Sequence, residues 1–153
     1  RNQRRKFLYY NHCQYGTNLV THSIGDKLSG FKREITQDRV NSYAEASGDH
    51  NPIHLNEAYA ASTRFGTRIA HGMLSLALVT EMLVIDFPKT WHSGGKIKVR
   101  FSAPVMPGEI VKIYGEITDI TETDIGFVAT CSIGCKKPDG TNAVVGQATV
   151  PLE

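Results

Sequence analysis

The pattern of hydrophobic and polar positions divides the chain near residue 95. Beyond this point apolar and polar residues alternate, as at Ile97, Val99 and Phe101, and this alternation is typical of half-buried strands. The pattern predicts strands over four ranges: 95–104, 109–120, 125–135 and 143–152. We expect hairpins to join these strands, and Pro138-Asp139-Gly140 predicts a tight turn before the last one.

Before residue 95 the pattern favours helices after one short strand, which is expected over residues 28–35. Thr36 is a plausible N-cap for a helix that Gly48 ends. Asn56 can cap a second helix over residues 57–61. These local signals place two short helices ahead of the longest apolar segment.

The longest apolar segment begins at Gly72, carries apolar side chains nearly all round the helical axis, and is terminated by Pro88. A helix of this kind is expected to be buried on most sides. One strand, then helices, then four strands imply an α+β fold with an antiparallel sheet. A single sheet wrapped around one long buried central helix is the hot-dog arrangement. Because one sheet leaves edges to cover, we expect it to pair with a second copy.

Composition is typical of one ordinary globular domain. The chain has 153 residues, of which 41% are hydrophobic and 21% are charged. No apolar run reaches the roughly 18 residues of a membrane span, so no membrane association is expected. We assign residues 24–153 to the domain and residues 1–23, which lack clear periodicity, to a partly ordered arm.

The net charge of +2 is unevenly distributed. Four basic residues lie at the start of the arm: Arg1, Arg4, Arg5 and Lys6. Without these four, the chain has 13 basic and 15 acidic residues. The domain lacks the basic stripe that nucleic-acid binding needs, so no nucleic-acid partner is expected. We interpret the basic start as a solvated tail. The remnant of a targeting segment and a site for an anionic group are the alternatives. Because the chain begins with Arg, we expect residues to precede it.

Three cysteines, Cys13, Cys131 and Cys135, are too few and too scattered for a disulfide framework. Cys131 and Cys135 would share one face of a strand, but no nearby His or Cys cluster completes a zinc site. We interpret them as buried reduced thiols, which suggests a reducing compartment. The expected location is the cytoplasm, with the mitochondrial matrix as the alternative.

The stretch Ser47 to His54, SGDHNPIH, gathers an aspartate, an asparagine and two histidines in one loop. A purely structural interpretation is complete, because Gly48 permits a sharp turn and Asp49 or Asn51 can close Asx turns. A catalytic interpretation is also available. His54 can move protons near neutral pH, and a carboxylate five residues away in a stiff loop can converge on the same point. The residues alone leave both interpretations open.

His71-Gly72 stands where the long helix begins. Backbone N–H groups at a helix start are unpaired and carry the positive end of the helix dipole. A glycine there lets a substrate carbonyl approach the backbone, which is the geometry of an oxyanion hole. A glycine needed only for tight packing is the alternative.

Two stretches together, residues 43–54 and the segment Ala70-His71-Gly72-Met73, carry a specific resemblance. The first holds an aromatic residue ahead of a G-D-x-N-P-x-H core, and the second matches an A/V-H-G-M signature. Residues 99–109 add an F-x-x-P-V-x-x-G-D/E-like segment. The chain thereby resembles the MaoC-type (R)-specific enoyl-CoA hydratases, also called hydratase 2, over about residues 24–150.

This resemblance implies hydration of a trans-2-enoyl thioester to an (R)-3-hydroxyacyl thioester, or the reverse dehydration. By position, Asp49 and His54 are the pair that activates water, and the Gly72 amide polarises the thioester carbonyl. Supporting roles in the site are implied for three further residues: Asn51, His71 and Thr80. No metal or redox cofactor is implied. The implied partners are an acyl-CoA or acyl-carrier-protein substrate and a second copy in a homodimer or higher homo-oligomer.

Two rival functions remain at this level. One is thioester hydrolysis on the same fold, and the other is a catalytically silent subunit that binds acyl thioesters. Arg64 and Arg68 flank the start of the long helix and are able to meet a phosphate of the carrier. Solvated charges near a helix end are the alternative for both.

Overall fold

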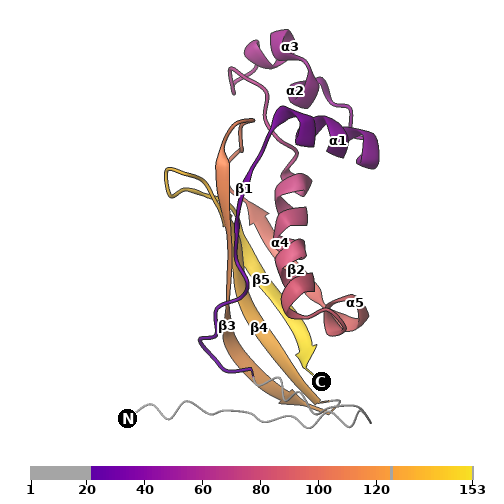
Figure 1. Ribbon diagram of the computed structural model, residues 1–153, viewed down its shortest axis with the longest axis vertical. Coiled ribbons are helices and arrows are strands. Elements are labelled where there is room, and N and C mark those ends of the chain that lie inside the picture. Colours follow the sequence, from indigo (N-terminus) through magenta and orange to yellow (C-terminus); the bar gives the residue numbers. More distant parts are fainter. Residues whose placement is uncertain (1–21, 125, 153) are drawn as a thin grey trace.

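A five-stranded antiparallel sheet with one long helix packed against it makes up most of the structure (Figure 1). The computed structural model describes residues 22–124 and 126–152, so the expected arm lies almost wholly outside the described residues. The elements in chain order are β1 (Lys32–Glu34), α1 (Gln37–Ser47), α2 (Pro52–Leu55), α3 (Glu57–Ala61), α4 (Gly72–Asp86), α5 (Thr90–Gly94), β2 (Lys96–Phe101), β3 (Ile110–Thr123), β4 (Gly126–Lys136) and β5 (Asn142–Leu152).

The strand order is β1-β3-β4-β5-β2, which corrects one expectation. Strands β3, β4 and β5 are joined by hairpins, and Pro138-Asp139-Gly140 forms the expected turn. Strand β2, however, pairs with β5, so the segment after it crosses to the far side of the sheet. The reason is that β1 already occupies the free edge of β3, with Arg33 opposite Val111.

The helix boundaries follow the local capping signals. Thr36 accepts a hydrogen bond from the Arg39 N–H at 3.2 Å, and Gly48 ends α1 with a φ of 75°. Asn56 caps α3 as expected. The sequence pattern missed α2 and α5, which are too short to show a helical period of apolar residues.

One side of α4 packs on the inner face of the sheet, and the opposite side is open. The buried cluster between them includes Leu78, Val79, Met82, Leu83, Ile113, Ile117 and Ile133. On the open side Met73 and Ile85 are 53% and 54% exposed. The α+β hot-dog arrangement is therefore confirmed, but burial of the helix on most sides is not. A single sheet covers only one face of a helix.

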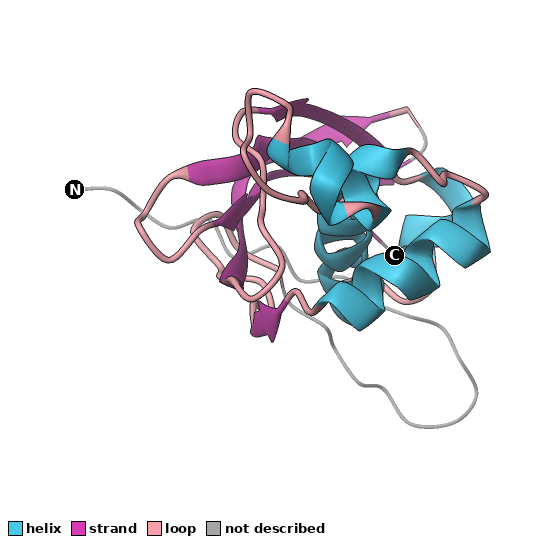
Figure 2. Cartoon of the chain, turned by 90° about the horizontal axis from the view of Figure 1, so that it is seen from above, coloured by secondary structure: helices cyan, strands magenta, loops and turns pink. Residues whose placement is uncertain are grey.

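The short helices α1, α2 and α3 lie together beyond the N-terminal end of α4 (Figure 1). Seen from above, the helices gather on one side of the curved sheet (Figure 2). This arrangement brings the loop after α1 close to the first residue of α4. The two halves of the candidate site therefore meet at one end of the molecule.

Cys131 and Cys135 are free and buried on the inner face of β4. Burial raises the pKa of Cys131 to about 12 and that of Cys135 to about 11. Cys13 lies outside the described residues. In the part of the chain that is described, no helix is both long and apolar enough to cross a lipid bilayer.

Candidate active site

The loop after α1 is stiffened by its own polar side chains. Asp49 Oδ1 accepts a hydrogen bond from the Asn51 N–H at 3.2 Å, and Asn51 Oδ1 accepts one from the Ile53 N–H at 3.1 Å. The second bond caps α2, which Pro52 begins. The structural interpretation of the loop is thus realised. It leaves the other carboxylate oxygen of Asp49, Oδ2, outside the turn.

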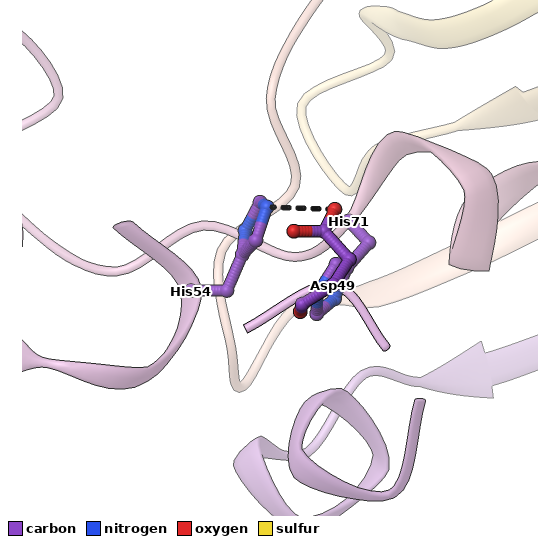
Figure 3. Close-up of side chains that lie close together, drawn as sticks. All are labelled: Asp49, His54 and His71. Carbon is purple, nitrogen blue, oxygen red and sulfur yellow. Dashed lines mark hydrogen bonds and ion pairs between the residues drawn. The ribbon is translucent and has the colours of Figure 1, made fainter. Parts of the chain in front are cut away.

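His54 lies on α2 and turns its ring toward Asp49 (Figure 3). Its Nδ1–H donates to the backbone carbonyl of Ile69 at 2.8 Å. In the neutral ring this leaves the lone pair on Nε2, which lies 4.0 Å from Asp49 Oδ2. The His54 side chain is 11% exposed and that of Asp49 is 54% exposed, so the pair spans the boundary between interior and solvent.

His71 contacts both Asp49 and His54. Its Nε2–H donates to the backbone carbonyl of Asp49 at 2.9 Å, and its ring stacks on that of His54 with centroids 3.8 Å apart. The ring of Tyr43 covers His71 at 4.9 Å. His71 is 2% exposed, and its Nδ1 has no hydrogen-bond partner among the described residues. These two contacts make His71 a candidate for positioning Asp49 and His54.

The surroundings of His54 keep its ring neutral. Burial, the largest influence, lowers its pKa, and the neighbouring His71 lowers it further. The hydrogen bond to Ile69 and the charge of Asp49 act in the opposite direction, and the net pKa is below the ordinary value of 6.5. Near neutral pH, His54 Nε2 is therefore able to accept a proton.

Gly72 begins α4 beside a cavity of about 270 Å³. Side chains and backbone from five segments line this cavity: Arg64, Phe65, Ile69, Ala70, Gly72, Ser75, Phe101, Ser102, Ala103, Pro104, Val105, Ala143 and Val144. A Cβ atom at position 72 would approach the Phe101 ring to 3.1 Å. The close packing against Phe101 is therefore observed, and the oxyanion-hole interpretation of Gly72 stays a prediction.

Asp49, His54 and His71 each offer a possible metal ligand atom, and these atoms lie within 4.8 Å of one another. The arrangement is nevertheless poor for a metal ion. The lone pairs of imidazoles lie in the ring planes, and these two rings pack against each other at an interplanar angle of 33°, with centroids 3.8 Å apart, rather than pointing at one centre. A carbonyl also occupies one nitrogen of each ring. The geometry favours acid–base chemistry.

Thr80 is not brought to the site. Its hydroxyl donates to the Leu76 carbonyl at 3.1 Å, and eight helical residues place it about 12 Å along α4 from Gly72. Two serines line the cavity, and sequence reasoning missed both: Ser102 and, on α4, Ser75. The available signal for Ser75 was its spacing of three residues from Gly72, which puts both on one helical face.

Comparison with known proteins identifies the family of the chain. Residues 20–131 match the MaoC like domain model. A 3-hydroxybutyryl-CoA dehydratase of Methylorubrum extorquens is 38% identical over 106 residues, 68% of each chain. An (R)-specific enoyl-CoA hydratase of Rhodospirillum rubrum is 31% identical over 86% of this chain and 92% of its own.

Among solved structures, an (R)-hydratase of A. caviae involved in PHA biosynthesis superposes with a TM-score of 0.74. That protein is 31% identical, and the match covers 85% of this chain and 96% of the other. The sequence relatives and the structural neighbour therefore indicate the same family. The chain belongs to the MaoC-like family of hydratases and dehydratases.

Proposed function

We propose that this chain adds water to trans-2-enoyl thioesters to give (R)-3-hydroxyacyl thioesters, or catalyses the reverse dehydration. The observation that carries the proposal is the 4.0 Å separation between Asp49 Oδ2 and the Nε2 of a neutral His54. Related proteins of the family carry the names dehydratase and (R)-specific hydratase. Their names match the chemistry that this pair supports.

The gap between the two atoms fits one water molecule. Oδ2 and Nε2 are too far apart for a direct hydrogen bond, yet a water about 2.8 Å from each can bridge them. Such a water is held by two acceptors, which polarise its O–H bonds. Asp49 and His54 thus act as a coupled unit on one nucleophile.

The reaction follows from this placement. The water oxygen bonds to C3 of the enoyl group as the pair takes a proton from it. The electrons of the C2–C3 double bond move to the thioester carbonyl oxygen, and an enolate forms. The Gly72 N–H at the start of α4 stabilises this oxygen. A proton returned by the pair to C2 completes the addition of one H and one OH.

The two arginines before the start of α4, Arg64 and Arg68, differ in whether a carboxylate pairs with them. Arg68 forms an ion pair with Glu57 at 3.0 Å. Arg64 lines the cavity, and its guanidinium lies 4.7 Å from the centroid of the Phe65 ring. We assign Arg64, rather than Arg68, to a phosphate of the CoA or carrier-protein arm. Arg64→Ala should raise the KM for an enoyl-CoA, with Arg68→Ala as the matched control.

A second copy of the chain is the proposed partner. Large hydrophobic side chains remain exposed on the open side of α4, at Met73 and Ile85. Covering them in a homodimer would remove this apolar surface from water. Light scattering at micromolar concentration tests this, and a monomer would overturn it. The free buried thiols suit a reducing compartment, either the cytoplasm or the mitochondrial matrix.

The test of function is the loss of enoyl absorbance with crotonyl-CoA and with a longer trans-2-enoyl-CoA. The product is then offered to (R)- and (S)-specific 3-hydroxyacyl-CoA dehydrogenases. We expect turnover to a product that only the (R)-specific enzyme oxidises. Release of free thiol without hydration would instead indicate a thioesterase. No reaction with either chain length would indicate either that the substrate carries an unusual acyl group or that the chain is a silent acyl-thioester-binding subunit.

A further inference from the structure

Ser75 lies on α4 three residues after Gly72, and both residues line the cavity. Positions three apart on a helix share one face. Ser75 is only 2% exposed, and its N–H bonds to the His71 carbonyl at 3.4 Å. A hydroxyl group is therefore buried one helical turn from the amide of Gly72.

The hydroxyl of Ser75 lacks a hydrogen-bond partner among the described residues. Hydroxyls within helices commonly donate to the carbonyl four residues earlier, as Thr80 does to Leu76. In the described chain, the fully enclosed side-chain atoms without a partner are Gln37 Oε1 and His71 Nδ1. Ser75 Oγ is not among these fully enclosed atoms, and Ser75 lines the cavity. A buried donor that faces a cavity is available to whatever fills that cavity.

We propose that the Ser75 hydroxyl donates a second hydrogen bond to the thioester oxygen, beside the Gly72 N–H, as this oxygen becomes an enolate. The proposal rests on the function proposed above. Helical side chains lean toward the N-terminus, which brings the Ser75 hydroxyl toward the Gly72 amide. Two donors fixed beside one oxygen stabilise a developing oxyanion more strongly than a single donor does. Ser75 keeps its proton throughout, so the balance of the reaction is unchanged.

The competing role for Ser75 is as a wall of the acyl pocket. A wall residue affects how tightly the acyl chain binds and so acts on KM. An oxyanion donor acts mainly in the transition state and so lowers kcat and kcat/KM together. The two roles therefore separate in steady-state kinetics.

The test compares Ser75→Ala with wild type in crotonyl-CoA hydration. The matched control is Ser93→Ala, which removes a serine hydroxyl from α5, where it donates to the Thr90 carbonyl at 3.2 Å. We expect kcat of Ser75→Ala to fall about 10²-fold, with KM within about threefold. We expect the control to match wild type. Retention of kcat within twofold, or a loss confined to KM, would overturn the proposal.

A second readout uses acetoacetyl-CoA, whose enolate form absorbs in the ultraviolet. Bound acetoacetyl-CoA should need a higher pH to enolise in Ser75→Ala than in wild type, because one donor to the enolate oxygen is missing. Equal enolisation in the two proteins would contradict the proposal. Wild-type hydration in the same assays reports on the proposed function separately. If wild type is inactive in hydration but still enolises acetoacetyl-CoA in a Ser75-dependent way, the proposed function is contradicted and the proposed hydrogen bond from Ser75 is supported.

Discussion

The sheet–helix core and the site end of this molecule use burial in opposite ways. The core between α4 and the sheet is apolar, with residues such as Leu83 and Ile133 fully enclosed. The described residues with buried polar side chains are His54, His71, Ser75 and Thr90, and the first three belong to the site. Each of these three carries a polar atom without a hydrogen-bond partner among the described residues: His54 Nε2, His71 Nδ1 and Ser75 Oγ. Burial of apolar side chains thus stabilises the fold in the core. At the site, burial leaves polar atoms without protein partners, so they are available to a ligand.

This difference predicts that activity and stability are separable by mutation. The largest effect is expected for the catalytic pair. Asp49→Asn and His54→Ala should each lower kcat by about 10²–10⁴-fold, because each removes a group that handles protons. The unfolding temperature should change little in Asp49→Asn, because that side chain is 54% exposed. Steady-state kinetics with thermal melting checks both, and near-normal turnover in either variant would contradict the paired mechanism.

The next effect is on stability and comes from the core. Leu83→Ala should destabilise the protein by about 2–5 kcal/mol, because it leaves a cavity under α4. The exposed substitution Glu122→Ala on β3 is the control and should stay within about 0.5 kcal/mol of wild type. Denaturant unfolding measures both. A loss below about 1 kcal/mol for Leu83→Ala would show that this part of the core is loosely packed.

His71 is expected to show an intermediate effect on both properties. His71→Phe keeps a ring against His54 but removes the hydrogen bond to the Asp49 carbonyl. We expect about a 10-fold loss of kcat from the misplaced carboxylate. Stability should fall by about 1 kcal/mol. Unchanged kinetics would mean that His71 does not position Asp49.

A smaller effect is expected from pH. The pKa of His54 is lowered in the folded protein, chiefly by burial, so the acid limb of kcat/KM should lie below pH 6.5. Well above pH 6.5 the ring is neutral in both the folded and the unfolded state and contributes nothing to the pH dependence of stability. As the pH falls below that value, the unfolded state binds the proton first, so stability should decrease. An acid limb at or above the ordinary histidine pKa would contradict the lowered value.

The smallest effect is expected at the buried thiols. With pKa values of about 12 and about 11, Cys131 and Cys135 stay protonated at neutral pH. In a Cys13→Ser variant, iodoacetamide should label the folded protein far more slowly than the unfolded protein. Rapid labelling under native conditions would show that β4 opens locally.

What the sequence predicts well in this chain is local. The Thr36 cap, the Gly48 terminus and the Asn56 cap depend on neighbouring residues, and each stands where it was expected. The partner of β2 and the open side of α4 depend on contacts far apart in the chain, which periodicity does not report.

The same limit applies to the site. Asp49 and His54 are predicted through one motif and Gly72 through a second, and the members of each motif lie close in sequence. The stacking of His71 on His54 and the opening of Ser75 onto the cavity depend on how α2 and α4 meet, which the motif does not encode. The motif therefore identifies the pair, and the fold supplies the residues around it.

The most direct test of the central claim is a double-mutant cycle on the pair. The claim is that Asp49 and His54 act together on one water between Oδ2 and Nε2. Asp49→Asn, His54→Ala and the double variant are compared in kcat/KM for crotonyl-CoA. We predict that the double variant loses about as much as the worse single variant, since residues acting as a unit are strongly non-additive. Losses that multiply would show that the two side chains act independently and would contradict the shared water.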